Sequence, residues 1–394
     1  MTDSSITTTG DGAFGVIVAS DGHVDLRNTA IETFGTAAHG FNIWPGGTAN
    51  AIGVSVNTHG DFAHGITATA GAEVTAENVI VTTAGAQADG LNLSDTGASI
   101  TMRGGSVYSA NGVGIHGAAA EAGRVLLQDG AVIGSGTGIA IRAGASDDPA
   151  LAGRLTSLTV EATGGVQIFG DAVVSTGGHS ATLSLADNSY WQGAGDGVTS
   201  VGIDGTSHWT MTASSDIGAL ATDGTIEFDS ANPYKTLTVG TLATNGGSFI
   251  LNTQLNEGGA ASQTDRIVVT GNASGEGILQ IRNNGGTGAY TGTGATDGIQ
   301  VVQVGGASDA NFELGSAAVV GIYDYKLVKA DGQNWYLQTE GQDPGNPIDP
   351  ELPGGHVVDT VPGYNIALAA GREHVLTSLD TFHERVGELR AEEM

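Results

Sequence analysis

The sequence contains no cysteine, so no disulfide can hold the fold together and stability must come from packing. Basic residues are also scarce: 13 lysines and arginines stand against 42 aspartates and glutamates, and no lysine precedes Lys235. Partners such as nucleic acids, heparin-like chains and acidic lipids require a basic surface. The formal charge of −29 therefore excludes nucleic acids, disfavours heparin-like chains and acidic lipids, and favours a solvated, self-repelling exterior.

Long apolar runs are absent as well. No stretch of 18 apolar residues predicts a transmembrane helix, and the N-terminus does not have the pattern of a signal peptide. A repeat pattern begins almost at Met1, without the polar first coil that stacked repeats need. We therefore expect upstream coils and any export signal to be missing from this chain.

Glycine, in contrast, is plentiful, with 65 in 394 residues. Segments 31–41, 56–66 and 81–91 align at an offset of 25 residues, and one glycine recurs at the same place in the following series: Gly15, Gly40, Gly65, Gly90, Gly114 and Gly138. A unit of this length is too short for a pair of helices but suits three strands and three turns. The sequence thus predicts an all-β chain, a right-handed parallel β-helix with three-strand coils over residues 1–340.

Four regions follow from the pattern. Residues 1–234 form the repeats, interrupted by a predicted loop at 142–149 and less regular from Leu155 onward. Residues 235–340 are denser in strands and are predicted to be the most stable part. Residues 341–362 form a linker rich in proline and glycine. The last 32 residues, 363–394, are predicted to form an amphipathic helix with an apolar stripe that nothing else in the chain covers: Val375, Leu376, Leu379, Phe382, Val386 and Leu389.

The strand-dense region carries a family resemblance. Its segments 237–242, 249–253, 265–275 and 334–337 resemble, in this order, the C-terminal passenger region of pertactin-like autotransporters. The stretch 379–388 resembles the helix that enters the barrel of those proteins. The resemblance implies type V secretion through the protein's own outer-membrane β-barrel, which this chain lacks, and display on a Gram-negative cell surface, with possible release. It also implies that the last coils fold first, as an intramolecular chaperone.

Candidate catalytic groups are few. No Gly-x-Ser-x-Gly motif occurs, and Gly205-Thr-Ser207 only faintly resembles a subtilisin-like serine motif. The acid pair Asp147-Asp148 has the proline-flanked context of a solvated loop. Large aromatic residues at Tyr190-Trp191 and His208-Trp209 are expected to fill the core rather than to bind sugar.

One polar column has the spacing of a ligand set. His39, His64 and Asp89 occupy the same repeat position, so they should stack about 4.8 Å apart. No fourth ligand is apparent, and a polar ladder at a corner is favoured over a metal site. We therefore assign no catalytic, cofactor or metal residue and predict a monomeric adhesin passenger that binds a host cell-surface or serum protein. The alternative is a carbohydrate-active β-helix enzyme, either a lyase or a glycosidase.

Overall fold

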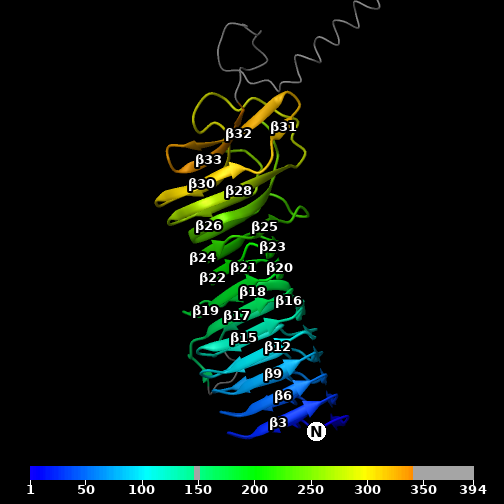
Figure 1. Ribbon diagram of the computed structural model, residues 1–394. Helices are drawn as coiled ribbons and strands as arrows, with labels where there is room; N and C mark the ends of the chain where they lie inside the picture. The colour runs from blue at the N-terminus through cyan, green and yellow to red at the C-terminus, as the bar shows by residue number, and fades with distance from the viewer. Residues whose placement is uncertain (146–150, 340–394) are drawn as a thin grey trace, which may run out of the picture.

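The chain forms a rod of stacked coils, seen in a computed structural model that describes residues 1–145 and 151–339 (Figure 1). The first five coils each contribute one strand to three columns. These strands are β1 (Ser5–Thr8), β4 (Ala30–Thr33), β7 (Ser55–Thr58), β10 (Ile80–Thr83) and β13 (Ser106–Ser109) in the first column; β2 (Val16–Val18), β5 (Phe41–Ile43), β8 (Ile66–Thr69), β11 (Leu91–Ser94) and β14 (Ile115–Ala118) in the second; and β3 (His23–Arg27), β6 (Thr48–Ile52), β9 (Glu73–Glu77), β12 (Ser99–Arg103) and β15 (Gly123–Gln128) in the third.

The later strands are less uniform in length, from two residues in β21 to 18 in β26. They are β16 (Val132–Gly144), β17 (Ser157–Thr163), β18 (Gln167–Val174), β19 (Ser180–Ala186), β20 (Tyr190–Gly193), β21 (Gly195–Asp196), β22 (Val198–Ile203), β23 (His208–Met211), β24 (Ser215–Thr222), β25 (Thr225–Phe228), β26 (Thr236–Thr253), β27 (Arg266–Val269), β28 (Ala273–Asn283), β29 (Ile299–Val304), β30 (Ser308–Leu314), β31 (Ala318–Val320), β32 (Tyr323–Ala330) and β33 (Asn334–Thr339). Within the described residues, no helix has the length and apolar character needed to cross a lipid bilayer.

Parallel pairing at a constant offset confirms the β-helix. Ile31 pairs with Val56, which pairs with Val81, and all three side chains are buried. The alternation of apolar and polar residues places one face of each strand in a core that runs along the rod. Stacked coils thus bury a continuous core that no single coil could form.

The predicted glycine stack is also confirmed. The N–H of Gly40 donates to the carbonyl of His64, and the N–H of Phe41 donates to the carbonyl of Gly65, both at 2.9 Å. A Cβ added at Gly40 would lie 2.1 Å from Cγ1 of Val56 and 2.6 Å from the Gly65 oxygen. Only glycine permits the coils to approach this closely at the corner.

The rod narrows beyond the regular repeats. Leu183 pairs with Val201, a much closer neighbour in sequence than the 25-residue repeat would give. Trp191 and Trp209 lie inside this section, and both indoles are fully buried. The prediction that aromatic residues fill the core is therefore confirmed for the two tryptophans, whose large rings suit coils that contain fewer residues. It is wrong for Tyr190 and His208, which alternate with the tryptophans on β20 and β23 and are only partly buried.

The predicted loop at 142–149 is wrong at its start. Arg142 and Gly144 belong to β16, in which Arg142 pairs with His116 on one side and with Val173 on the other. Ile141 and Ala143 are buried on either side of Arg142, so the strand alternation continues through the charged residue. The acid pair Asp147-Asp148 lies outside the described residues.

The C-terminal end differs from the prediction in two ways. Segments 237–242 and 249–253 are parts of one strand, β26, with an irregularity between Asn245 and Gly247. The parallel helix also ends before residue 340, because β33 pairs antiparallel with both β29 and β32, and β31 with β32. Alternation is the same in parallel and antiparallel strands, so the pattern could not reveal this cap.

The cap closes the core. Phe312 meets Trp335 edge to face, with ring centroids 4.9 Å apart. An open end would expose both apolar side chains and unpaired strand edges. The region boundaries at 234 and 235 stay predictions, and the predicted linker 341–362 and helix 363–394 lie outside the described residues.

Candidate functional site

A polar cavity of about 450 Å³ lies over the second strand column, across β5, β8, β11 and β14. It is lined by the corner residues of three coils, by outward-facing residues of the column, and by one residue from beyond β16. These residues are Ala37, His39, Asn42, Phe62, His64, Thr67, Thr69, Asp89, Asn92, Ser94, His116, Ala118 and Leu151. The sequence-predicted column of His39, His64 and Asp89 forms one side of this cavity.

The corner column has a repeating hydrogen bond. The N–H of His64 donates to Nδ1 of His39 at 3.1 Å, and the N–H of Asp89 donates to Nδ1 of His64 at 2.9 Å. The N–H of Val113 donates in the same way to Oδ1 of Asp89 at 2.9 Å. Each corner side chain thus satisfies a backbone donor of the following coil, which would otherwise be buried without a partner. This confirms the polar ladder at a corner.

These bonds fix the tautomer of two histidines. A nitrogen that accepts a hydrogen bond carries no proton, so the ring of His39, and that of His64 in its neutral form, holds its proton on Nε2. The rings stack with centroids 4.9 Å apart. Burial, and then the charge of His64, lowers the pKa of His39 to about 3. His39 is therefore neutral at neutral pH and serves as an acceptor.

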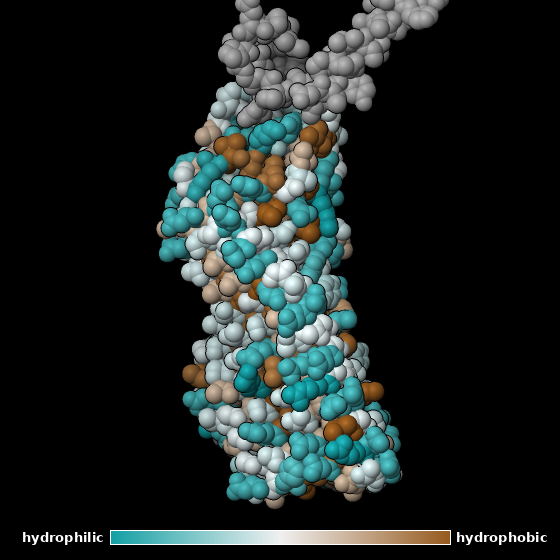
Figure 2. Space-filling model, viewed as in Figure 1, coloured by the Kyte–Doolittle hydropathy of each residue, from teal (hydrophilic) through white to brown (hydrophobic). Residues whose placement is uncertain are grey.

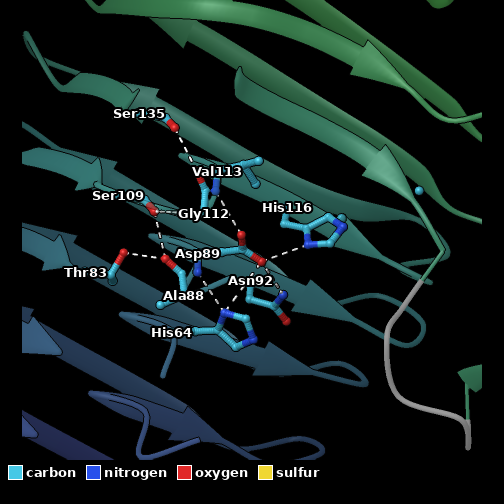
Figure 3. A network of polar contacts seen from close by, with 12 residues as sticks. His64, Thr83, Ala88, Asp89, Asn92, Ser109, Gly112, Val113, His116 and Ser135 are labelled. Carbon is cyan, nitrogen blue, oxygen red and sulfur yellow. Dashed lines mark hydrogen bonds and ion pairs between the residues drawn. The ribbon is translucent and has the colours of Figure 1, made fainter. Parts of the chain in front are cut away.

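Asp89 is the centre of the network (Figure 3). Its Oδ2 accepts a hydrogen bond from Nδ1 of His116 at 2.8 Å and another from Nδ2 of Asn92 at 3.3 Å. The same oxygen lies 3.5 Å from Nδ1 of His64. Burial raises the pKa of this carboxyl, but the hydrogen bond from His116, the charges of His116 and His64, and the N–H of Val113 together bring the pKa below its ordinary value. Asp89 is therefore ionised and holds His116 in a defined orientation.

His116 is the functional residue that the sequence analysis missed. It follows the repeat glycine by two positions on an outward-facing strand site, where it pairs with Asn92, which in turn pairs with Thr67. All three side chains in this strand column are polar. That shared polarity, two residues after Gly65, Gly90 and Gly114, was the signal that could have found them.

Two buried polar atoms in the cavity have no protein partner among the described residues. They are Oγ1 of Thr67 and Nε2 of His116. The two residues are only 6% and 7% exposed. Buried polar atoms are nearly always paired in native proteins, so two unpaired ones in one cavity mark it as a place for a ligand or ordered water.

The cavity is closed on one side by residues that follow β16. Leu151 lines it, and Nη1 of Arg154 forms an ion pair with Oδ1 of Asp95 at 2.7 Å, just beyond β11. The chain after β16 therefore returns across earlier coils. The cavity is thus built from segments far apart in the sequence.

Other candidate groups have structural roles. Ser207 is buried, and its Oγ accepts the N–H of Ser189, within a turn shaped by Asp204 and Thr206. No group of three or more His, Cys, Asp or Glu side chains in residues 1–145 and 151–339 has the arrangement of a metal site. The Asp89–His116 pair thus provides a carboxylate and an oriented imidazole, suited to hydrogen bonding.

Comparison with known proteins shows which family the chain resembles. Residues 215–327 match the family model "Autochaperone Domain Type 1". The pertactin autotransporter of Bordetella bronchiseptica is 34% identical over 163 residues, which are 39% of this chain and 17% of that protein. The chain thus resembles a pertactin-like autotransporter passenger. The passenger is also similar to the adhesin BmaC autotransporter of Brucella suis, with 34% identity over 236 residues, covering 55% of the passenger and 6% of BmaC.

Two further proteins, one sequence relative and one solved structure, are also similar to the chain. The autotransporter adhesin AIDA-I of Escherichia coli is 43% identical over 84 residues, 20% of the passenger and 6% of AIDA-I. The passenger therefore spans only a small part of these relatives. The crystal structure of the autotransporter UpaB from E. coli strain CFT073 has a TM-score of 0.48 and 16% identity, covering 85% of the passenger and 88% of UpaB.

Proposed function

We propose that the passenger is the displayed, adhesive part of an autotransporter adhesin on a Gram-negative cell surface. In this proposal it is secreted through its own C-terminal outer-membrane barrel and binds a host cell-surface or serum protein or its glycans. The observation that carries the proposal is the similarity to proteins named as adhesins: BmaC and AIDA-I.

The surface agrees with a role in binding outside the cell. Polar residues cover most of the visible face of the rod, with apolar residues scattered among them (Figure 2). A charge of −29 and the absence of cysteine suit a chain that crosses the outer membrane unfolded and then folds coil by coil without disulfides. The parallel stack presents a long surface on which the cavity over β5, β8, β11 and β14 is one recessed site.

An enzymatic function is not proposed. Glycosidases use two carboxylates that flank the scissile bond. Among the described residues that line the cavity, Asp89 supplies the only carboxylate, and both of its oxygens already accept hydrogen bonds. Such an acid is committed to holding the network together rather than to proton transfer.

The test is adhesion by bacteria that display the passenger. The full chain is fused to a pertactin-type barrel in a non-adherent E. coli strain and compared with a fusion that lacks residues 1–214 but keeps the autochaperone match. We expect the full chain to increase binding to cultured epithelial cells, and the shortened fusion to lose that increase. Equal binding by the two fusions, at equal surface display, would contradict the proposal.

A further inference from the structure

We propose that the cavity over β5, β8, β11 and β14 is a binding subsite for one ring of a neutral saccharide. The subsite rests on the proposed adhesin function and names the class of ligand. The ring would stack on Phe62 and exchange hydrogen bonds with Thr67 and His116.

The unpaired atoms define the polar half of the subsite. Because Nδ1 of His116 is hydrogen-bonded to Asp89, the ring is held in place and its Nε2 is left as a buried atom without a partner. A hydroxyl group can satisfy this nitrogen either by donating to it or by accepting from it. The hydroxyl of Thr67 can donate as well as accept. A sugar carries several adjacent hydroxyl groups that act in both ways, so a single ring can satisfy both atoms.

Phe62 supplies the apolar half. Its side chain lines the cavity and is 42% exposed. The face of an aromatic ring is negative, and the C–H groups on one face of a pyranose are weakly positive, so the two faces attract. Phe62 also has a φ of +57°, a conformation that is rare for a bulky residue. Ala37 and Gln87 occupy the equivalent corner of the neighbouring coils, so the backbone there does not require an aromatic.

Charge selects a neutral sugar. The ionised Asp89 lies in the cavity, and the described lining residues include no lysine or arginine. A carboxylate or sulfate on the ligand would meet the repulsion of Asp89 and of the whole chain. The volume of about 450 Å³ is in the usual range for small-ligand sites.

The experiment measures sugar binding by the full chain. Saturation-transfer NMR at neutral pH is run with lactose, maltose and methyl α-mannoside, and with 3′-sialyllactose as the acidic probe. We expect signals from at least one neutral sugar and none from sialyllactose. Two variants then test the contacts: Phe62→Asn and Thr67→Val, each expected to weaken binding tenfold or more.

Matched controls separate binding from folding. Gln87→Asn changes the equivalent corner of the next coil outside the cavity, and Thr222→Val removes another buried, unpaired hydroxyl far along the rod. Both controls should bind like the wild type. Asn tolerates the left-handed conformation better than Phe, and valine removes an unpaired hydroxyl, so both test variants should melt no lower than the wild type.

The outcomes distinguish the two proposals. The subsite is overturned if no neutral sugar binds, if sialyllactose binds equally well, or if both test variants bind like the wild type. Cell adhesion that persists without sugar binding overturns the subsite and leaves the adhesin function standing. Sugar binding by a chain that confers no adhesion supports the subsite and contradicts the adhesin function.

Discussion

Trp191 and Trp209 lie face to face in the core of the rod, with ring centroids 4.5 Å apart and planes inclined by 7°. They are direct partners in the pairing of β20 with β23. Each indole N–H donates to a backbone carbonyl at 2.9 Å, that of Gly170 for Trp191 and that of Gly193 for Trp209. Their polar atoms are thus satisfied while the rings fill the short coils.

Replacing Trp209 with alanine should destabilise the rod strongly. The change leaves a cavity and removes the hydrogen bond from the indole to the Gly193 carbonyl, so we expect a loss of about 3–5 kcal/mol in the free energy of unfolding. Guanidinium titration monitored by circular dichroism measures it. Trp44→Ala is the control, because Trp44 is 43% exposed and its loss should cost less than about 1 kcal/mol. Equal losses for the two variants would contradict the packing described.

Adding one methyl group at the glycine corner should also be costly. In Gly65→Ala the new Cβ would lie 2.1 Å from Cγ1 of Val81 and 2.6 Å from the carbonyl oxygen of Gly90. We expect a loss of about 1–3 kcal/mol or more, because the coils must move apart. Gly10→Ala is the matched control, since its Cβ would meet nothing closer than Ala13 at 3.6 Å. An unfolding midpoint for Gly65→Ala equal to that of the wild type would contradict the close approach of the coils at this corner.

Acid should destabilise the rod partly through His39. The pKa of His39 is about 3 in the folded chain, against an ordinary value of 6.5, so protons bind preferentially to the unfolded chain. The stability contributed by the neutral ring is present above pH 6.5 and is lost as the pH falls toward 3. Between pH 6.5 and 4 the wild type should therefore lose stability more steeply than His39→Gln, by up to about 1.4 kcal/mol per pH unit.

Urea titrations at a series of pH values check this expectation. Glutamine keeps an acceptor for the N–H of His64 but does not titrate in this range. The control is Gln87→Asn, which changes an exposed residue that does not titrate and should follow the wild-type curve. Parallel curves for the wild type and His39→Gln would exclude His39 as the source.

The two ends of the rod should differ in stability. Residues 215–339 include the autochaperone match, the long strand β26 and the antiparallel cap with its Phe312–Trp335 contact. We expect this segment, expressed alone, to unfold cooperatively and at a higher urea midpoint than residues 1–214 expressed alone. The reverse order of midpoints would refute the predicted division of stability.

The coil architecture was predictable because it repeats. Gly40, Gly65 and Gly90 mark one corner, and Ile31, Val56 and Val81 mark the core face at the same interval. Stacking then follows, since one coil cannot bury its own apolar face. Sequence alternation could not separate the parallel coils from the antiparallel cap, because both place alternate residues on opposite faces.

The cavity was only half predictable. His39, His64 and Asp89 stand out because they share a repeat position beside the glycine. His116 occupies the strand position that holds Asn92 and Thr67 in the two preceding coils. Many polar residues fit such a position, so the sequence alone did not link His116 to Asp89. Leu151 reaches the cavity through an insertion whose return path depends on the tertiary structure.

The direction of the backbone hydrogen bonds has a mechanical consequence. They join one coil to the next, as from Gly40 to His64 and from Gly65 to Asp89, so they lie along the rod rather than across it. A tensile force between the two ends loads the coil interfaces in series, and every interface bears the same tension. The rod then yields at its weakest interface first and lengthens by peeling off one coil at a time, which would let it absorb a sudden pull without losing its remaining folded coils.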